Sequence, residues 1–187
     1  MPHRVCPWWM GYLLTSPIRR WMMKPDDVIG AYVRPGFTVL EPGPGMGFFT
    51  LPLAKMVGQS GRVIAIDLQS KMIDSLKRRA KKAKLLDRID ARVSSANSLG
   101  VDDLHETVDL TLAFAMIHEL PQVHPFFGEV AEASKPGALL LIAEPAGHVN
   151  AEKFEAEIQQ AQAAGFTVVD RPTIKRSHAV LMRNLRK

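Results

Sequence analysis

Residues 39–50 read VLEPGPGMGFFT, and this stretch decides how the rest of the chain is interpreted. An apolar run ends in the acid Glu41, and a helical pattern begins at Phe48. Between them stand three alternate glycines, Gly43, Gly45 and Gly47. The order predicts a strand, a tight turn and the start of a helix. Because glycine has no Cβ and a helix start presents unpaired N–H groups, we expect a nucleotide-like ligand to lie against this turn.

The spacing of the glycines excludes two common nucleotide sites. The dinucleotide fingerprint G-x-G-x-x-G, started at Gly43, requires a glycine where the chain has Phe48, and the Gly-Lys-Ser/Thr of a phosphate loop is absent. What remains is E-x-G-x-G-x-G, which resembles the first motif of the class I (Rossmann-like) methyltransferases that depend on S-adenosyl-L-methionine (SAM). The resemblance implies that the glycine turn approaches the methionine part of SAM, with Glu41 close to it.

A second acid follows the glycine turn at the distance in sequence at which this architecture places a ribose-binding carboxylate. Residues 61–68 read GRVIAIDL, a buried strand that ends in Asp67 about 20 residues beyond the last glycine. In this architecture a carboxylate at that place hydrogen-bonds a ribose diol, and we expect Asp67 to do so. A helix cap or a solvated loop carboxylate is the alternative for both Asp67 and Glu41.

The resemblance extends from about residue 35 to the end and implies SAM as the cofactor. Many members of the family carry an Asp-Ala pair that contacts the adenine where this chain has Ser95 and Ala96, so Ser95 or Asn97 would supply the hydrogen bond instead. A turn role is the alternative for both. The residues expected to contact the cofactor are Glu41, Gly43, Gly45, Gly47, Asp67, Leu68, Met72, Ser95, Ala96, Asn97, Ala113 and Phe114. No metal is expected.

Residues 108–121, VDLTLAFAMIHELP, predict a strand that runs into a loop at the sheet end that carries the glycines. The stretch resembles the family's fourth motif, which implies that residues 113–118 face the methyl group. His118 stands at the carboxyl edge of this strand, where its near-neutral pKa would suit a catalytic base. A packing histidine is the alternative, because many methyl transfers need no base.

Apolar periodicity around these motifs predicts an α/β fold. We expect a doubly wound, mostly parallel seven-stranded sheet with helices on both faces and a C-terminal antiparallel strand pair. Further helices are expected around residues 72–83, 123–134 and 150–164, and further strands at 89–93, 138–145, 166–169 and 178–182. Residues 135–137, Lys-Pro-Gly, are expected to turn the chain into the strand at 138.

The N-terminal residues 1–34 are expected to form a helical lid segment on a SAM-binding domain of residues 35–187. One helix is expected at 16–23 and another from Pro25 that ends before Arg34. The apolar run at 5–14 is too short to span a bilayer and lacks a clear cleavage site. Residues 6–9, Cys-Pro-Trp-Trp, are expected to cover the SAM crevice. Packing on the outside of the domain, or in a dimer contact, is the alternative.

Composition sets the remaining expectations. The chain has 187 residues, of which 47% are hydrophobic and 23% charged, and a net charge of +5, as in an ordinary single globular domain. The single cysteine excludes an internal disulfide framework and a cysteine-cluster metal site, which fits a reducing cytoplasm. No membrane partner is expected, and the protein would be a monomer or a homodimer.

The expected function is methyl transfer to a small-molecule acceptor. The basic run at residues 77–84 also permits an RNA or other nucleic-acid acceptor, but aromatic residues are not interleaved with its charges. The Asn/Asp-Pro-Pro-aromatic motif of amine methylation is also missing after Leu112. A non-catalytic SAM-binding protein is a third hypothesis, and an NAD oxidoreductase is a distant fourth.

Overall fold

The computed structural model describes residues 23–186, which form two compact units. The first unit comprises residues 23–94 and the second unit residues 95–186. The helix expected at 16–23 and the expected lid residues 6–9 lie outside the described residues, apart from position 23 itself. None of the helices in the described part of the chain is both long and apolar enough to cross a membrane.

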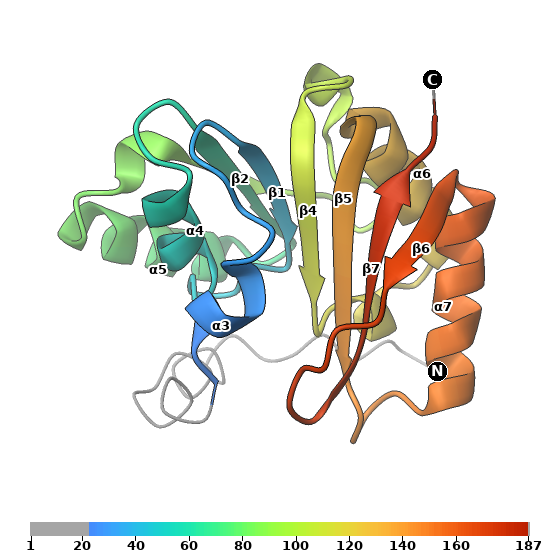
Figure 1. Ribbon diagram of the computed structural model, residues 1–187. Coiled ribbons are helices and arrows are strands. Elements are labelled where there is room, and N and C mark those ends of the chain that lie inside the picture. The colour runs from blue at the N-terminus through green and yellow to red at the C-terminus, as the bar shows by residue number, and fades with distance from the viewer. Residues whose placement is uncertain (1–22, 187) are drawn as a thin grey trace. The chain divides into compact units, whose positions relative to one another are not determined.

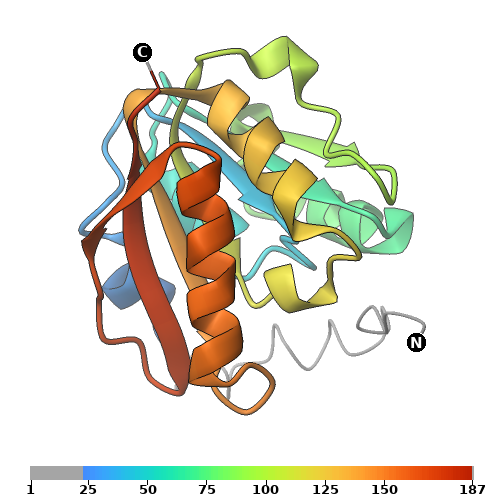
Figure 2. The ribbon, with the colours of Figure 1, turned by 90° about the vertical axis from the view of Figure 1, so that its right-hand side faces the viewer.

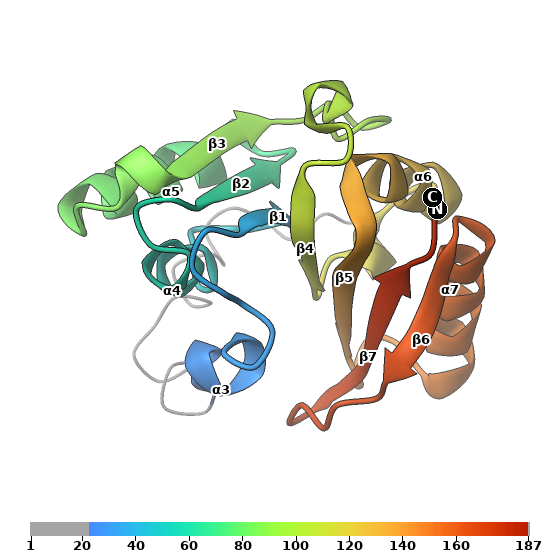
Figure 3. The ribbon, with the colours of Figure 1, turned by 45° about the horizontal axis from the view of Figure 1, so that its top comes forward.

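The first unit is built on three parallel strands, with β2 between β1 and β3 (Figures 1 and 3). Its elements in chain order are α3 (Pro25–Ile29), β1 (Thr38–Pro42), α4 (Thr50–Met56), β2 (Arg62–Asp67), α5 (Ser70–Lys82), the 3-10 helix η1 (Leu86–Arg88) and β3 (Ile89–Val93). Because β1 and β2 are parallel and in register, with Glu41 opposite Ala65, the residues that follow both strands emerge at the same edge.

Helices α4 and α5 pack on β2, and their apolar faces form the core of this unit. Leu53 of α4, Leu76 of α5 and Ile64 of β2 are all fully buried. Helix α4 begins at Thr50, two residues later than expected from the pattern at Phe48. Phe49 is the N-cap residue, and Gly47, with a φ of 86°, belongs to the turn that precedes the helix.

The second unit contains the remaining four strands. Its elements are η2 (Asp102–Leu104), β4 (Val108–Phe114), η3 (Ile117–Glu119), α6 (Val123–Ala133), β5 (Ser134–Pro145), α7 (Ala151–Ala163), β6 (Phe166–Asp170) and β7 (Ser177–Asn184). Strands β4 and β5 are parallel, while β7 is antiparallel to both β5 and β6. Figure 2 shows α6 and α7 side by side, where α6 contacts β5 and α7 contacts β6 and β7.

The Lys-Pro-Gly sequence at 135–137 is not the turn that its composition predicts. It lies inside β5, where the pairing with β4 advances from Val108 opposite Ser134 to Leu110 opposite Leu139. Three extra residues on β5 are therefore accommodated as an irregularity, and Gly137 adopts a φ of 78° there. A Pro and a Gly would ordinarily end a strand, but at a bulge the strand can continue past them.

The fold class is the predicted one. The strand order is β3-β2-β1-β4-β5-β7-β6, a seven-stranded mixed sheet with an antiparallel C-terminal pair. The strand predicted at 89–93 is β3, and the helix predicted from Pro25 is α3. The helix predicted at 150–164 is α7, and Asn150 is its N-cap, because Oδ1 of Asn150 accepts a hydrogen bond of 2.9 Å from the backbone N–H of Lys153.

Candidate functional site

The glycine turn of the first unit has all three alternate glycines in the left-handed region. The φ angles are 68° at Gly43, 54° at Gly45 and 86° at Gly47. A Cβ on Gly47 would lie 2.5 Å from Cδ1 of Leu76, whereas a Cβ on Gly45 would meet no atom within 4 Å. Gly47 is therefore required by the packing of α5, while Gly45 stands at an open position against which a ligand can lie.

Hydrogen bonds hold the turn in this shape. The N–H of Gly43 donates to the carbonyl of Ile66 over 2.8 Å, and the N–H of Gly47 donates to the carbonyl of Pro44 over 3.0 Å. From α5, Nη1 of Arg79 donates to the carbonyl of Met46 over 2.5 Å. The turn is thus fixed both by β2 and by the helix that follows β2.

Asp67, at the end of β2, lies beside the glycine turn as the sequence predicts. Its Oδ2 accepts a hydrogen bond of 3.2 Å from the N–H of Gly45, and its Oδ1 accepts one of 2.9 Å from the N–H of Gln69. One carboxylate therefore links the middle of the glycine turn to the start of α5.

Glu41, at the end of β1, is only 3% exposed, and its Oε2 has no hydrogen-bond partner among residues 23–186. Its pKa is raised to about 8, chiefly by burial and to a smaller extent by the charge of Asp67. The Thr50 hydroxyl opposes this rise, although its Oγ1 makes no hydrogen bond of normal geometry within the described residues. Near pH 7 Glu41 is therefore largely protonated and can donate as well as accept.

The other predicted cofactor residues are divided between the two units. In the first unit, Leu68 is 44% exposed and Met72 is buried in the core. In the second unit, Oγ of Ser95 accepts from the N–H groups of Asn97 and Ser98 over 3.3 and 3.1 Å, which is the turn role weighed against adenine binding. Ala96 is exposed, Ala113 is buried, and Phe114 at the end of β4 is half-buried. Their contact with a cofactor remains a prediction.

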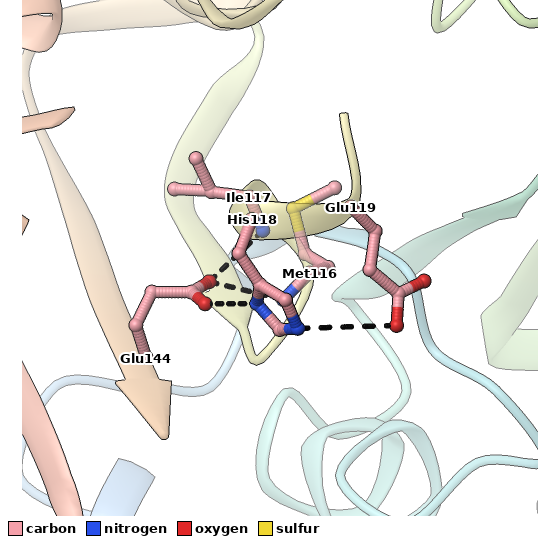
Figure 4. A network of polar contacts seen from close by, with 5 residues as sticks. All are labelled: Met116, Ile117, His118, Glu119 and Glu144. Carbon is pink, nitrogen blue, oxygen red and sulfur yellow. Dashed lines mark hydrogen bonds and ion pairs between the residues drawn. The ribbon is translucent and has the colours of Figure 1, made fainter. Parts of the chain in front are cut away.

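His118, the predicted base, lies in η3 beside the end of β5 (Figure 4). Its Nδ1 makes a short hydrogen bond with Oε2 of Glu144, a carboxylate that is 0% exposed. The other oxygen, Oε1, accepts hydrogen bonds from the N–H groups of Met116 and Ile117 over 3.0 and 2.9 Å. Glu144 therefore fixes the loop after β4 and the imidazole at the same time.

The surroundings of His118 are acidic. The pKa of His118 is raised above 6.5, first by the hydrogen bond to Glu144 and then by the charges of Glu144, Glu119 and Glu157, while burial opposes the rise. The ring of His148 lies edge-on to that of His118, with centroids 5.5 Å apart. Buried acids thus favour the protonated imidazole and set the pH at which it becomes a base.

Glu157 of α7 is the second buried acid near His118. It is 8% exposed, and its Oε2 has no hydrogen-bond partner in the described part of the chain. Burial, and then the charge of Glu144, raise the pKa of Glu157 to about 7, while His118 and Lys153 lower it. Ionisation of this carboxyl therefore occurs near neutral pH.

Glu157→Gln should make the protein progressively more stable than the wild type as the pH rises from 4.5 to about 7. In the folded protein Glu157 keeps its proton up to about pH 7, against an ordinary value of 4.5, so the wild type loses stability across this interval. The amide is never ionised and escapes that loss. Urea unfolding at pH 5 and pH 8 measures the difference.

The matched control is Glu155→Gln, an exposed change on the same helix. Glu155 pairs with Arg171, and its pKa is lowered, so its contribution to stability is constant between pH 5 and pH 8. A pH-independent difference for Glu157→Gln would show that Glu157 is not a buried acid.

The sequence analysis missed two acids near His118, Glu144 and Glu157, although the sequence pattern around each of them could have indicated it. Glu144 ends the apolar run at 138–143, on a strand parallel to the one that leads to His118. The carboxyl ends of adjacent parallel strands meet at one edge of a sheet, which brings the two side chains together. Glu157 stands on the apolar face of α7 with Phe154, Ile158 and Ala161, where an acid is out of place. Within residues 23–186, no group of three His, Cys, Asp or Glu residues is arranged to hold a metal ion.

Comparisons with known proteins place the chain among methyltransferases. A family model described as "Methyltransferase domain" matches residues 34–179. The crystal structure of a SAM-dependent methyltransferase from Aquifex aeolicus is 26% identical with a TM-score of 0.86, and the match covers 97% of this chain and 100% of that one.

Curated relatives of the chain include methyltransferases of quinone biosynthesis. The ubiquinone/menaquinone biosynthesis C-methyltransferase UbiE of Hydrogenovibrio crunogenus is 27% identical over 67% of this chain and 48% of its own length. A ubiquinone biosynthesis O-methyltransferase of Rhodopseudomonas palustris is 27% identical over 75% of this chain and 51% of its own length. The chain thus spans about half the length of these relatives.

Proposed function

The chain belongs to the methyltransferase-domain family, and from this we propose that it is a SAM-dependent methyltransferase acting on a small-molecule acceptor. The observation that carries the proposal is the arrangement at the ends of β1 and β2. There, a glycine turn with an open position at Gly45 is hydrogen-bonded to Asp67 and follows the buried Glu41.

The residues of this arrangement fit SAM. The open side of Gly45 admits a chain against the backbone, as the methionine part of SAM requires. Asp67 offers carboxylate oxygens to the ribose hydroxyls. The unpartnered Oε2 of Glu41 suits a positively charged ligand, because a nearby cation would lower the raised pKa of this carboxyl and let it ionise. SAM would supply the methyl group.

The proposed acceptor is a small molecule, and His118 is the proposed base toward it. The two curated relatives described above are named for ubiquinone or ubiquinone/menaquinone biosynthesis, and another is named as an arsenite methyltransferase, which supports a compact acceptor. The single cysteine fits a cytoplasmic location.

A nucleic-acid acceptor is the second candidate, and it rests on the basic residues of α5. The structure weakens it at one position, because Arg79 donates to the carbonyl of Met46 and so has a structural role in the glycine turn. The remaining lysines and Arg78 are exposed, as on an ordinary solvated helix face.

Two measurements test the proposal. Calorimetric titration should show binding of SAM and of S-adenosylhomocysteine, with none of NAD at the same concentrations. Incubation with methyl-labelled SAM should then transfer label to a component of a metabolite extract and not to RNA. Binding of NAD without SAM would exclude the proposed cofactor, whereas label on RNA alone would favour the second candidate.

Asp67→Ala should weaken SAM binding by about 1.5–3 kcal/mol, the usual contribution of hydrogen bonds to a charged group. The change removes the acceptor that we propose for the ribose hydroxyls, and also the acceptor of the Gly45 N–H. Asp74→Ala is the control, since Asp74 is exposed on α5 and should leave the affinity unchanged. Unchanged SAM affinity in a folded Asp67→Ala variant would place the ribose elsewhere.

A further inference from the structure

We propose that Glu144 is a positioning residue for His118. Glu144 keeps the imidazole proton on Nδ1, so that Nε2 of His118 can take a proton from a hydroxyl group of the methyl acceptor. The proposal deepens the proposed function and rests on it for the identity of the reaction. It adds a chemical class of acceptor, one that loses a proton when it is methylated.

The argument begins with the orientation of the Glu144 carboxylate. Its Oε1 accepts from two backbone N–H groups, those of Met116 and Ile117, at 3.0 and 2.9 Å. Backbone N–H groups can only donate, so Oε1 must remain an acceptor and the carboxylate cannot turn. Oε2 is thereby directed at Nδ1 of His118.

The tautomer of His118 follows from this orientation. An ionised carboxylate only accepts hydrogen bonds, so Nδ1 must donate to Oε2 and therefore carries a proton. A neutral imidazole has one N–H, which leaves the lone pair on Nε2. The imidazole is thus oriented as a proton acceptor at Nε2.

Nε2 is accessible for that role. The nearest acid on its side is Oε1 of Glu119, at 4.0 Å, which is too far for a hydrogen bond (Figure 4). No residue of the described chain hydrogen-bonds Nε2, and the side chain is 20% exposed. The other titratable groups that face the ring are Glu157, with Lys153 near it on α7, and His148 after β5.

The proton balance of the proposed step is simple. The acceptor's O–H bond breaks, its proton passes to Nε2, and its electron pair stays on oxygen to form the new bond to the methyl carbon. SAM, when bound, would supply that methyl group and would keep the electron pair of the broken carbon–sulfur bond, leaving as S-adenosylhomocysteine. His118 becomes an imidazolium, which Glu144 stabilises through Nδ1. Deprotonation of Nε2 to solvent would restore the base.

Glu144→Gln separates this role from a merely structural one. The amide oxygen would keep the place of Oε1, because the Met116 and Ile117 N–H groups still need an acceptor. The amide NH₂ would then face Nδ1 and donate to it. Nδ1 would become the acceptor, so the proton of the neutral imidazole would move to Nε2, where it prevents Nε2 from acting as a base.

The experiment is nitrogen-15 NMR of the full chain labelled at histidine, with the His118 signals assigned from their loss in His118→Gln. Above its pKa, wild-type His118 should carry its proton on Nδ1, and in Glu144→Gln on Nε2, with a lower pKa. Glu119→Gln is the control, since it removes a charge on the Nε2 side and should leave the tautomer unchanged.

The wild-type spectrum alone can overturn the proposal. A neutral wild-type His118 with its proton on Nε2 would do so, even if Glu144→Gln failed to fold. The same tautomer in both proteins would also overturn it. Neither result depends on SAM, so failure here is distinguishable from failure of the proposed function, which calorimetry with SAM reports separately.

Discussion

Gly45→Val should abolish detectable SAM binding while the protein remains folded. A Cβ at position 45 meets no protein atom within 4 Å, so the new side chain would occupy the open space where we propose that the methionine part of SAM lies. The φ of 54° is also one that a β-branched residue avoids, which adds strain to the turn. Calorimetric titration with SAM measures the loss.

Gly58→Val is the control that distinguishes backbone strain from obstruction of the proposed SAM position. Gly58 also has a positive φ, 71°, and a Cβ there would also meet no atom within 4 Å, but it follows α4 instead of the glycine turn. The control should therefore lose similar stability and keep its SAM affinity. Wild-type affinity in Gly45→Val would contradict the proposed position of the ligand.

Glu144→Ala should lower the free energy of unfolding by about 3–5 kcal/mol, the range for removing one partner of a buried charged pair. Glu144 is 0% exposed and accepts from two backbone N–H groups and from His118. Alanine would leave all three donors without their acceptor. Urea unfolding at pH 6, where the raised pKa of His118 keeps it charged, measures the loss.

Glu129→Ala is the comparison for this effect. Glu129 also accepts from a backbone N–H, that of Leu99 at 2.8 Å, and from the Ser98 hydroxyl at 3.0 Å, but it is only half-buried. Water can replace the carboxylate there, so we expect a much smaller loss of stability. Equal losses in the two variants would show that the buried position of Glu144 contributes nothing.

Much of the fold follows from local patterns in the sequence. The strand that ends at Asp67 is β2, and the glycines at positions 43, 45 and 47 adopt the positive φ angles for which glycine is suited. These features depend on residues close together in the chain. Periodicity and turn chemistry were therefore sufficient to predict them.

Other features depend on contacts between distant residues, which no local pattern contains. Residues 135–137 have the composition of a turn, yet pairing with β4 holds them within a strand. His118 was predicted at a strand end, but its partner Glu144 is 26 residues away. The raised pKa of Glu157 likewise arises from burial against another element.

The hydrogen bonds within the glycine turn also affect the entropy of ligand binding. Four donors, the N–H groups of Gly43, Gly45 and Gly47 and the guanidinium of Arg79, hold the turn through hydrogen bonds within the protein. The conformational entropy of this segment is therefore lost when the chain folds, and a ligand need not order it again. The turn is then a preorganised part of the binding site. The association rate is governed by diffusion and desolvation and not by loop rearrangement.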